Sequence, residues 1–164
     1  MLDGPARALI GYHGKFLTDT RGTGVMNRVY KEHGPHRGPF ETRRGGALIA
    51  NGSGTAVAYA LWNLEERGVM FIDPGVAVYQ GMVIGENAKP QDLEVNPLKA
   101  KQLTNIRAAG KDDAVRLTPP RKMSLEQAIA YIGDDELVEV TPKSVRLRKR
   151  HLDPHERKRA AKAA

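Results

Sequence analysis

The sequence predicts an α+β fold, in which a helical N-terminal segment is followed by a strand-rich region with a long basic loop and short helices. Three observations support this class. Leu9, Tyr12 and Phe16 recur at helical spacing near the start of the chain. Short apolar runs bounded by Gly, Pro and Asn follow within residues 45–85, as expected of strands. Residues 86–113 are mostly polar and lose this periodicity, which is typical of a functional or disordered loop.

The N-terminal segment predicts one helix and one strand. Residues 5–18 carry the helical pattern, although Gly11 and Gly14 weaken it because glycine disfavours a helix interior. Residues 23–31 predict a strand. Residues 32–44 are rich in Gly, Pro and His, which indicates a linker or a long loop.

A hairpin is predicted at the start of the strand-rich region. Residues 47–50 and 55–61 read as strands, and the sequence Asn-Gly-Ser-Gly at 51–54 is a strong turn signal between them. Residues 63–67 read as a short helical turn that ends at Gly68.

A second strand pair and the long loop follow. Residues 69–72 and 76–84 predict strands around the turn Asp-Pro-Gly at 73–75. The loop then occupies residues 86–113, and residues 114–117 predict a return to a strand.

The C-terminal third predicts a capped helix and two strands. Residues 124–132 form the helix, with Ser124 and Gln127 at the positions of a reciprocal capping box. Residues 136–140 and 144–149 predict the strands.

Positive charge is concentrated in the tail, residues 144–164. This segment holds eight basic and two acidic residues, so +6 of the net charge of +7 lies there. Asp153 and Pro154 predict the cap and first residue of a basic C-terminal helix. A nearly neutral body with a basic tail indicates an anionic partner.

Composition excludes several classes of protein and site. The chain has no cysteine, which excludes disulfides and cysteine-based zinc sites. No apolar run approaches the roughly 18 residues that span a membrane, so no membrane partner is expected. The N-terminus lacks a basic start followed by an apolar stretch, so the expected location is cytoplasmic.

The sequence predicts no catalytic, cofactor or metal site. A phosphate-binding P-loop needs a glycine five residues before a Gly-Lys pair and Ser or Thr after it. The Gly14-Lys15 pair instead has Leu9 before it and Phe16 after it. His151 and His155 are four residues apart, but Pro154 lies between them near a predicted helix start. His33 and His36 lie in a Gly/Pro-rich loop, so ordinary loop histidines are favoured over a metal site. The chain is therefore predicted not to be an enzyme by itself.

The residues predicted to bind RNA lie in the loop and the tail. Loop cations with no acid among them suit phosphate neutralisation, and neutral hydrogen-bonding groups accompany them. These loop residues are Lys99, Lys101, Thr104, Asn105, Arg107 and Lys111. In the tail, Arg146, Arg148 and Arg150 share one face of a strand, with Lys149 opposite. The alternatives left open are an ordinary solvated loop and a soluble C-terminus.

Long dispersed runs resemble a family of translational GTPases. Residues 16–26, FLTDTRGTGVM, resemble the last domain of the relatives of elongation factor G. Other runs resemble the BipA/TypA family in particular. They are AYALWNLEERG (58–68), PGVAVYQGMVIGE (74–86), LTNIRAAG (103–110), VRLTPPR (115–121) and DDELVEVTPKSVRLRKR (134–150).

The resemblance implies a domain organisation. Residues 1–37 would be the second half of a ferredoxin-like domain, and residues 38–164 the family's own C-terminal domain. The GTPase domain of the family, with its GTP and magnesium, has no counterpart in these residues. The unpaired edge of a half-domain predicts either a disordered N-terminus or pairing with another copy of the chain.

The resemblance also implies a function. It implies binding to the ribosome at the factor site, with contacts to large-subunit rRNA and tRNA, and a role in large ribosomal subunit assembly and stress adaptation. The alternative is a self-contained basic module that binds nucleic acid or protein without a factor-site role.

Overall fold

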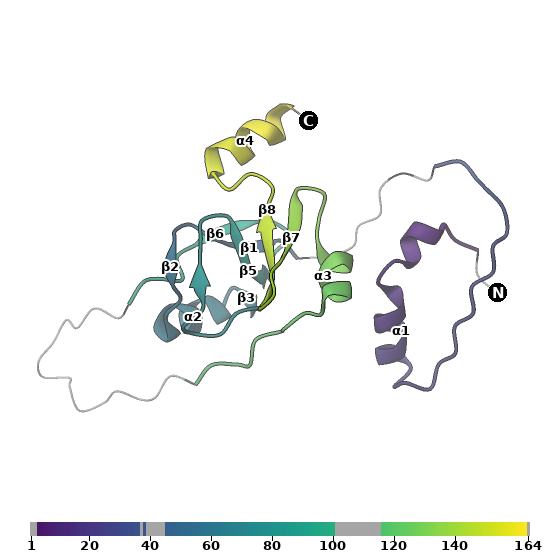
Figure 1. The fold of residues 1–164 in the computed structure, drawn as a ribbon, viewed down its shortest axis with the longest axis horizontal. Helices are drawn as coiled ribbons and strands as arrows, with labels where there is room; N and C mark the ends of the chain where they lie inside the picture. The colour runs from purple at the N-terminus through teal and green to yellow at the C-terminus, as the bar shows by residue number, and fades with distance from the viewer. Residues whose placement is uncertain (1–2, 37, 39–44, 101–115, 164) are drawn as a thin grey trace, which may run out of the picture.

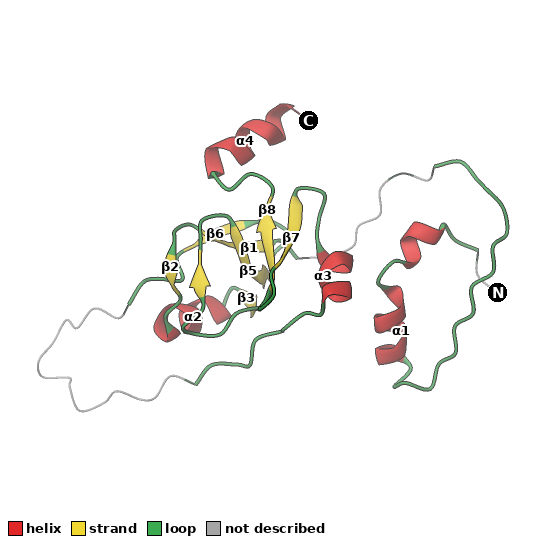
Figure 2. Ribbon diagram, viewed as in Figure 1, coloured by secondary structure: helices red, strands yellow, loops and turns green. Residues whose placement is uncertain are grey.

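The computed structural model describes residues 3–36, 38, 45–100 and 116–163. It has an α+β fold, in which a twisted sheet forms the body and a helical N-terminal segment lies beside it (Figures 1 and 2). The C-terminal helix stands off the end of the sheet (Figure 1).

The main sheet has six strands in the order β6-β1-β5-β8-β7, with β3 also paired to β5. These strands are β1 (Ala47–Ala50), β3 (Gly68–Met70), β5 (Met82–Asn87), β6 (Leu93–Val95), β7 (Glu136–Val140) and β8 (Val145–Lys149). Neighbouring strands are antiparallel except β1 and β6, which are parallel. The short strands β2 (Gly54–Thr55) and β4 (Ala77–Val78) pair separately.

Apolar clusters cover both faces of the sheet. Leu48 and Ile84 point into the cluster that includes Leu61 of α2 (Ala58–Glu65). Ile49 points into the cluster that contains Ala128 of α3 (Leu125–Tyr131). Successive side chains of a strand alternate between faces, so β1 is buried throughout because α2 and α3 cover opposite sides.

The predicted hairpin at 47–61 is wrong. Residues 58–65 form the helix α2, while β1 and β2 belong to different sheets. The Ala-rich alternation fits a helix as well as a strand, because alanine is the strongest helix former and short apolar runs are ambiguous. Residues 63–65 of the predicted helical turn are the last residues of α2, and Gly68 begins β3.

Three more expectations need correction in the middle of the chain. The strand predicted at 76–84 is divided into β4 and β5 by Gly81, whose φ is +82°. The segment predicted as a loop from residue 86 contains β6, which adds to the sheet beside β1. Residues 116–117 are not in a strand, and residues 114–115 lie outside the described chain.

The N-terminal helix is interrupted. A 3₁₀ turn, η1 (Ala6–Leu9), precedes α1 (Tyr12–Asp19), because Gly11 adopts a φ of +74° between them. The strand predicted at 23–31 is not formed within the described residues. A strand requires a hydrogen-bonded neighbour, and the side chains of Val25 and Val29 are 83% and 89% exposed.

The C-terminal elements confirm the sequence predictions. The helix α3 has the capping box, in which Ser124 and Gln127 each accept a hydrogen bond from the other's backbone N–H. The strands β7 and β8 also form. The tail then forms α4 (Pro154–Ala163). Within the described ranges, no helix is both long and apolar enough to cross a membrane.

Candidate nucleic-acid interface

The basic loop leaves the body at a fixed point. The N–H of Val57 donates to the carbonyl of Pro97 at 3.0 Å, and Leu98 packs against the apolar cluster on the α2 side. Lys99 follows directly and is exposed. Of the predicted loop contacts, only Lys99 lies in the described chain. The others, Lys101, Thr104, Asn105, Arg107 and Lys111, lie outside it.

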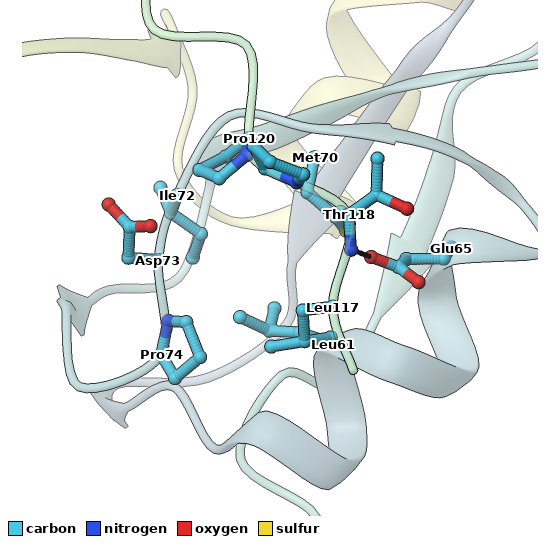
Figure 3. A pocket seen from close by; sticks show the side chains of 10 residues that line it. Leu61, Glu65, Met70, Ile72, Asp73, Pro74, Leu117, Thr118 and Pro120 are labelled. Carbon is cyan, nitrogen blue, oxygen red and sulfur yellow. Dashed lines mark hydrogen bonds between the residues drawn. The ribbon is translucent and has the colours of Figure 1, made fainter. Parts of the chain in front are cut away.

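The chain rejoins the body beside the same cluster. Leu117 packs against it, and the N–H of Thr118 donates to Oε1 of Glu65 at 2.6 Å (Figure 3). The N–H of Arg121 then donates to the carbonyl of Met70 at 2.8 Å. Both ends of the segment between residues 100 and 116 are therefore held on one side of the sheet.

Arg121 holds the chain in place where it rejoins the body after residue 116, and the sequence did not predict this role. Its guanidinium lies 4.9 Å from the ring centroid of Phe71 and 5.2 Å from that of Tyr131. Its Nη2 lies 2.6 Å from Oε2 of Glu86. Stacking on aromatic rings together with an ion pair fixes the side chain. No local pattern reveals this, because Phe71, Glu86 and Tyr131 come from distant parts of the sequence.

A pocket of about 250 Å³ opens under the returning chain, between α2 and the segment that follows β3 (Figure 3). Leu61, Ile72 and Leu117 form part of its apolar wall. The charged groups that line the pocket, Glu65 and Asp73, are carboxylates, and Asp73 pairs with Lys122 at 2.9 Å. An anionic rim repels phosphate, so this pocket does not resemble a nucleotide site.

The β8 arginines lie on one face, as predicted. Arg146 and Arg148 are half-buried, while Leu147 between them is buried on the other face. Nη1 of Arg146 lies 3.6 Å from Oε1 of Glu139, and Oε2 of the same carboxylate accepts a hydrogen bond at 2.6 Å from the hydroxyl of Tyr79. Burial, together with this bond and the charge of Glu139, raises the pKa of Tyr79 to about 12.

Arg150 lies just beyond the end of β8 and is exposed. Its Nη2 donates to the carbonyl of Asp134 at 3.0 Å, and its backbone N–H donates to the carbonyl of Asp135 at 2.8 Å. The guanidinium bonds to a neutral carbonyl there, so its positive charge is not cancelled. Arg150 therefore adds an exposed cation just beyond the end of β8.

Lys149 takes a different role from the predicted one. Its side chain is 1% exposed, and its Nζ lies 2.5 Å from Oδ2 of Asp92, 2.8 Å from Oδ2 of Asp135 and 2.9 Å from Oε1 of Glu136. Burial lowers the pKa of Lys149, but hydrogen bonds to the three carboxylates outweigh it and leave this pKa raised. Its charge is neutralised inside the protein, which removes Lys149 from the RNA-facing set.

Hydrogen bonds cap the start of the helix α4, and Arg157 ties the helix to neighbouring parts of the chain. Oδ1 of Asp153 accepts from the N–H groups of Glu156 at 3.1 Å and His155 at 2.7 Å, and these bonds lower the pKa of Asp153. Nη1 of Arg157 donates to the carbonyls of His151 and Leu152, both at 2.7 Å. Its Nη2 pairs with Glu94 of β6. The remaining cations of α4 are exposed: Lys158, Arg159 and Lys162.

Candidate metal ligands do not form a site in the described chain. Across residues 3–36, 38, 45–100 and 116–163, no three His, Asp or Glu side chains are grouped in a way that could hold a metal ion. His151 has one acidic neighbour, with Nδ1 3.9 Å from Oε2 of Glu156.

Comparison with known proteins gives a consistent match. Residues 45–154 match the TypA/BipA C-terminal domain. Similar curated proteins carry the name large ribosomal subunit assembly factor BipA. The one from Synechocystis sp. is 53% identical over 145 residues, which cover 88% of this chain and 24% of the relative. The one from Salmonella typhimurium is 51% identical over 157 residues, 95% of this chain and 26% of the relative.

The protein of that name from Escherichia coli K12 is 49% identical over 160 residues, which cover 97% of this chain and 26% of the relative. The chain thus spans about a quarter of the length of the curated relatives that it matches.

Proposed function

Because this chain belongs to the TypA/BipA family, we propose that it is the RNA-contacting C-terminal region of a factor for large ribosomal subunit assembly. One observation carries the proposal. The chain on both sides of the basic loop is fixed to the same apolar cluster, through Leu98 on one side and Leu117 on the other. Four cations and no acid occupy residues 99–111 between these anchors.

This arrangement suits an irregular RNA surface. A loop fixed at both ends loses less freedom on binding than a free tail, so more of the phosphate attraction contributes to affinity. Cations neutralise phosphates with release of counterions, which makes the interaction sensitive to salt. The proposed partners are large-subunit rRNA and tRNA on the ribosome.

The β8 face is the second element of the proposed interface. Arg146 and Arg148 are half-buried and Arg150 is exposed, so their guanidinium groups remain accessible at one edge of the body. Glu139 offsets part of the charge of Arg146. Arg148 and Arg150 are therefore the stronger phosphate contacts of this set.

The proposed role of these residues is binding rather than catalysis. The GTP and magnesium that the family resemblance implies belong, in this proposal, to the GTPase domain of the family. A cytoplasmic location and a part in stress adaptation extend the same proposal. The contribution of this region is to hold the factor on the ribosome.

A second candidate is a protein-interaction role, favoured by the N-terminal segment. Residues 23–31 are extended without a paired strand among the described residues, and they expose Val25, Val29 and Tyr30. An unpaired extended segment with apolar side chains can add to the sheet edge of another copy. Sedimentation equilibrium of the isolated chain tests this, because self-association gives a mass that rises with concentration.

Cosedimentation with purified large ribosomal subunits tests the main proposal. We expect the chain to pellet with large subunits at low salt and progressively less at moderate salt. Absence from the pellet at both salt concentrations would contradict the proposed function for this region.

A further inference from the structure

The exposed cations of α4 lie along one side of the helix. At 100° per residue, Lys158, Arg159 and Lys162 fall within one arc, and Arg157 falls on the opposite side. All three are exposed. We call these three residues the α4 cationic face. It extends over roughly 6 Å along the helix axis.

This face is unfavourable for the isolated helix. Like charges three and four residues apart repel one another, and Lys158, Arg159 and Lys162 have that spacing. A ten-residue helix is already marginal in water. Among the described residues, Arg157 is the α4 cation that pairs with an acidic group, and a bound polyanion would relieve the repulsion among the other three.

The structure nevertheless holds α4 firmly. The carboxylate of Asp153 caps its first turn, and Arg157 ties it to two carbonyls and to Glu94 on the edge strand β6. The preceding residue Leu152 packs closely against Gly81, so that a Cβ on Gly81 would lie 2.7 Å from Cα of Leu152. The orientation of the cationic face is thus fixed before any partner binds.

We propose that the α4 cationic face binds the phosphate backbone of double-stranded RNA, with Arg157 as its positioning residue. The proposal rests on the RNA-binding function above and adds a second, separate contact. Figure 1 shows α4 beyond the end of the sheet, away from the points where the described chain meets the basic loop. The two sites can therefore engage different parts of one RNA.

The chemistry of α4 favours a duplex over other anions. The helix has no Phe, Tyr or Trp, so it lacks the large aromatic rings that stack best on single-stranded bases. Cations that are held in place but do not reach base edges suit recognition of an RNA duplex by its shape and the positions of its phosphates. Its apolar residues besides Pro154 are alanines, which bury too little surface to insert into a lipid interface.

The first test compares the full chain with a variant in which Lys158, Arg159 and Lys162 are changed to Gln, a good helix former. The probe is a blunt RNA duplex of about 20 base pairs, titrated at several salt concentrations. We expect affinity to fall by about tenfold or more and the salt slope to fall by about three, one for each cation. The matched control changes three exposed cations elsewhere, Lys15, Arg28 and Lys89, to Gln and should bind more tightly than the α4 variant.

The second test separates positioning from general attraction. Glu94→Gln removes the acidic partner of Arg157 and makes the chain more positive. If duplex binding depends only on net positive charge, this variant should bind more tightly. If it depends on Arg157 holding the α4 cationic face in place, the variant should bind more weakly. Arg157→Lys keeps the charge but lacks the forked geometry, so it should also bind more weakly.

The outcomes are distinguishable. If the parent binds duplex RNA and the α4 variant binds equally well, the α4 proposal fails and the loop proposal stands. If the parent binds neither duplex RNA nor large subunits, both fail. Binding to vesicles of phosphatidylserine and phosphatidylcholine that depends on α4, without duplex binding, would assign the face to a membrane and overturn the proposal.

Discussion

The ammonium group of Lys149 lies 2.9 Å from the carboxylate of Glu136, and the two side chains are 1% and 0% exposed. The same ammonium group also pairs with Asp92 and Asp135, whose side chains are more exposed. This cluster connects β8 with the segments that begin β6 and β7. It turns a residue of the most basic stretch of the chain into part of the interior.

Lys149→Met should destabilise the protein by about 3–5 kcal/mol, because it removes the ammonium group that pairs with the buried carboxylate of Glu136. Urea unfolding followed by circular dichroism measures the change. Arg148→Met is the matched control, since Arg148 is half-buried on the opposite face, and it should cost less than about 1 kcal/mol. Equal effects of the two substitutions would contradict a structural role for Lys149.

Stability should decline at alkaline pH. The pKa of Tyr79 is raised to about 12 and that of Lys149 is raised from its ordinary value. A raised pKa in the folded state gives stability that is complete below the unfolded-state pKa and is lost as pH rises through the folded-state pKa. For Tyr79 that window lies between pH 10 and about 12.

Tyr79→Phe removes one titrating group, so the free energy of unfolding should fall less steeply in that window than in the parent. Urea midpoints across the window measure the slope. Tyr30→Phe serves as the control, because Tyr30 is exposed and lies outside the sheet. A slope for Tyr79→Phe as steep as that of the parent would mean that the bond to Glu139 does not hold the phenol in its neutral form.

Asp153→Ala should fray the first turn of α4, because two backbone N–H groups lose their acceptor. Amide hydrogen exchange at His155 and Glu156 measures the loss of protection. Asp153→Asn keeps an acceptor and should retain most of it. The depressed pKa of Asp153 adds a pH dependence, in which the cap is present above the ordinary value of 3.8 and is lost as pH falls through the folded-state pKa.

Gly68→Ala should disrupt the pairing of β3 with β5. A Cβ at Gly68 would lie 1.8 Å from the carbonyl oxygen of Glu86, so the backbones must separate. We expect a loss of more than about 2 kcal/mol in urea unfolding. Gly14→Ala is the contrasting substitution, because a Cβ at this helical position meets no atom within 4 Å. It should leave stability unchanged or raise it, since alanine favours a helix.

Local signals predicted the elements that depend on local interactions. The helix α3 follows from its capping box at Ser124 and Gln127, and α4 from the Asp-Pro start. The β8 alternation correctly placed Arg146 and Arg148 on one face and Lys149 on the other. Each of these patterns is set by residues within a few positions of one another.

Predictions that depended on tertiary partners failed. Residues 58–65 fit strand and helix patterns alike, and packing of Leu61 on the sheet decides for the helix. The short strand β6 exists because β1 offers it an edge. The interior position of Lys149 required Asp92, 57 residues away, which no spacing in the sequence indicates.

The central claim is that the loop cations bind ribosomal RNA. The most direct test is cosedimentation with large ribosomal subunits of a variant with Lys99, Lys101, Arg107 and Lys111 changed to Ala. Its control carries an equal loss of charge at exposed positions elsewhere, Lys15, Arg28, Arg67 and Lys89 changed to Ala. We predict that the parent and the control pellet with the subunits and that the loop variant stays in the supernatant. A loop variant that pellets as well as the parent would contradict the claim.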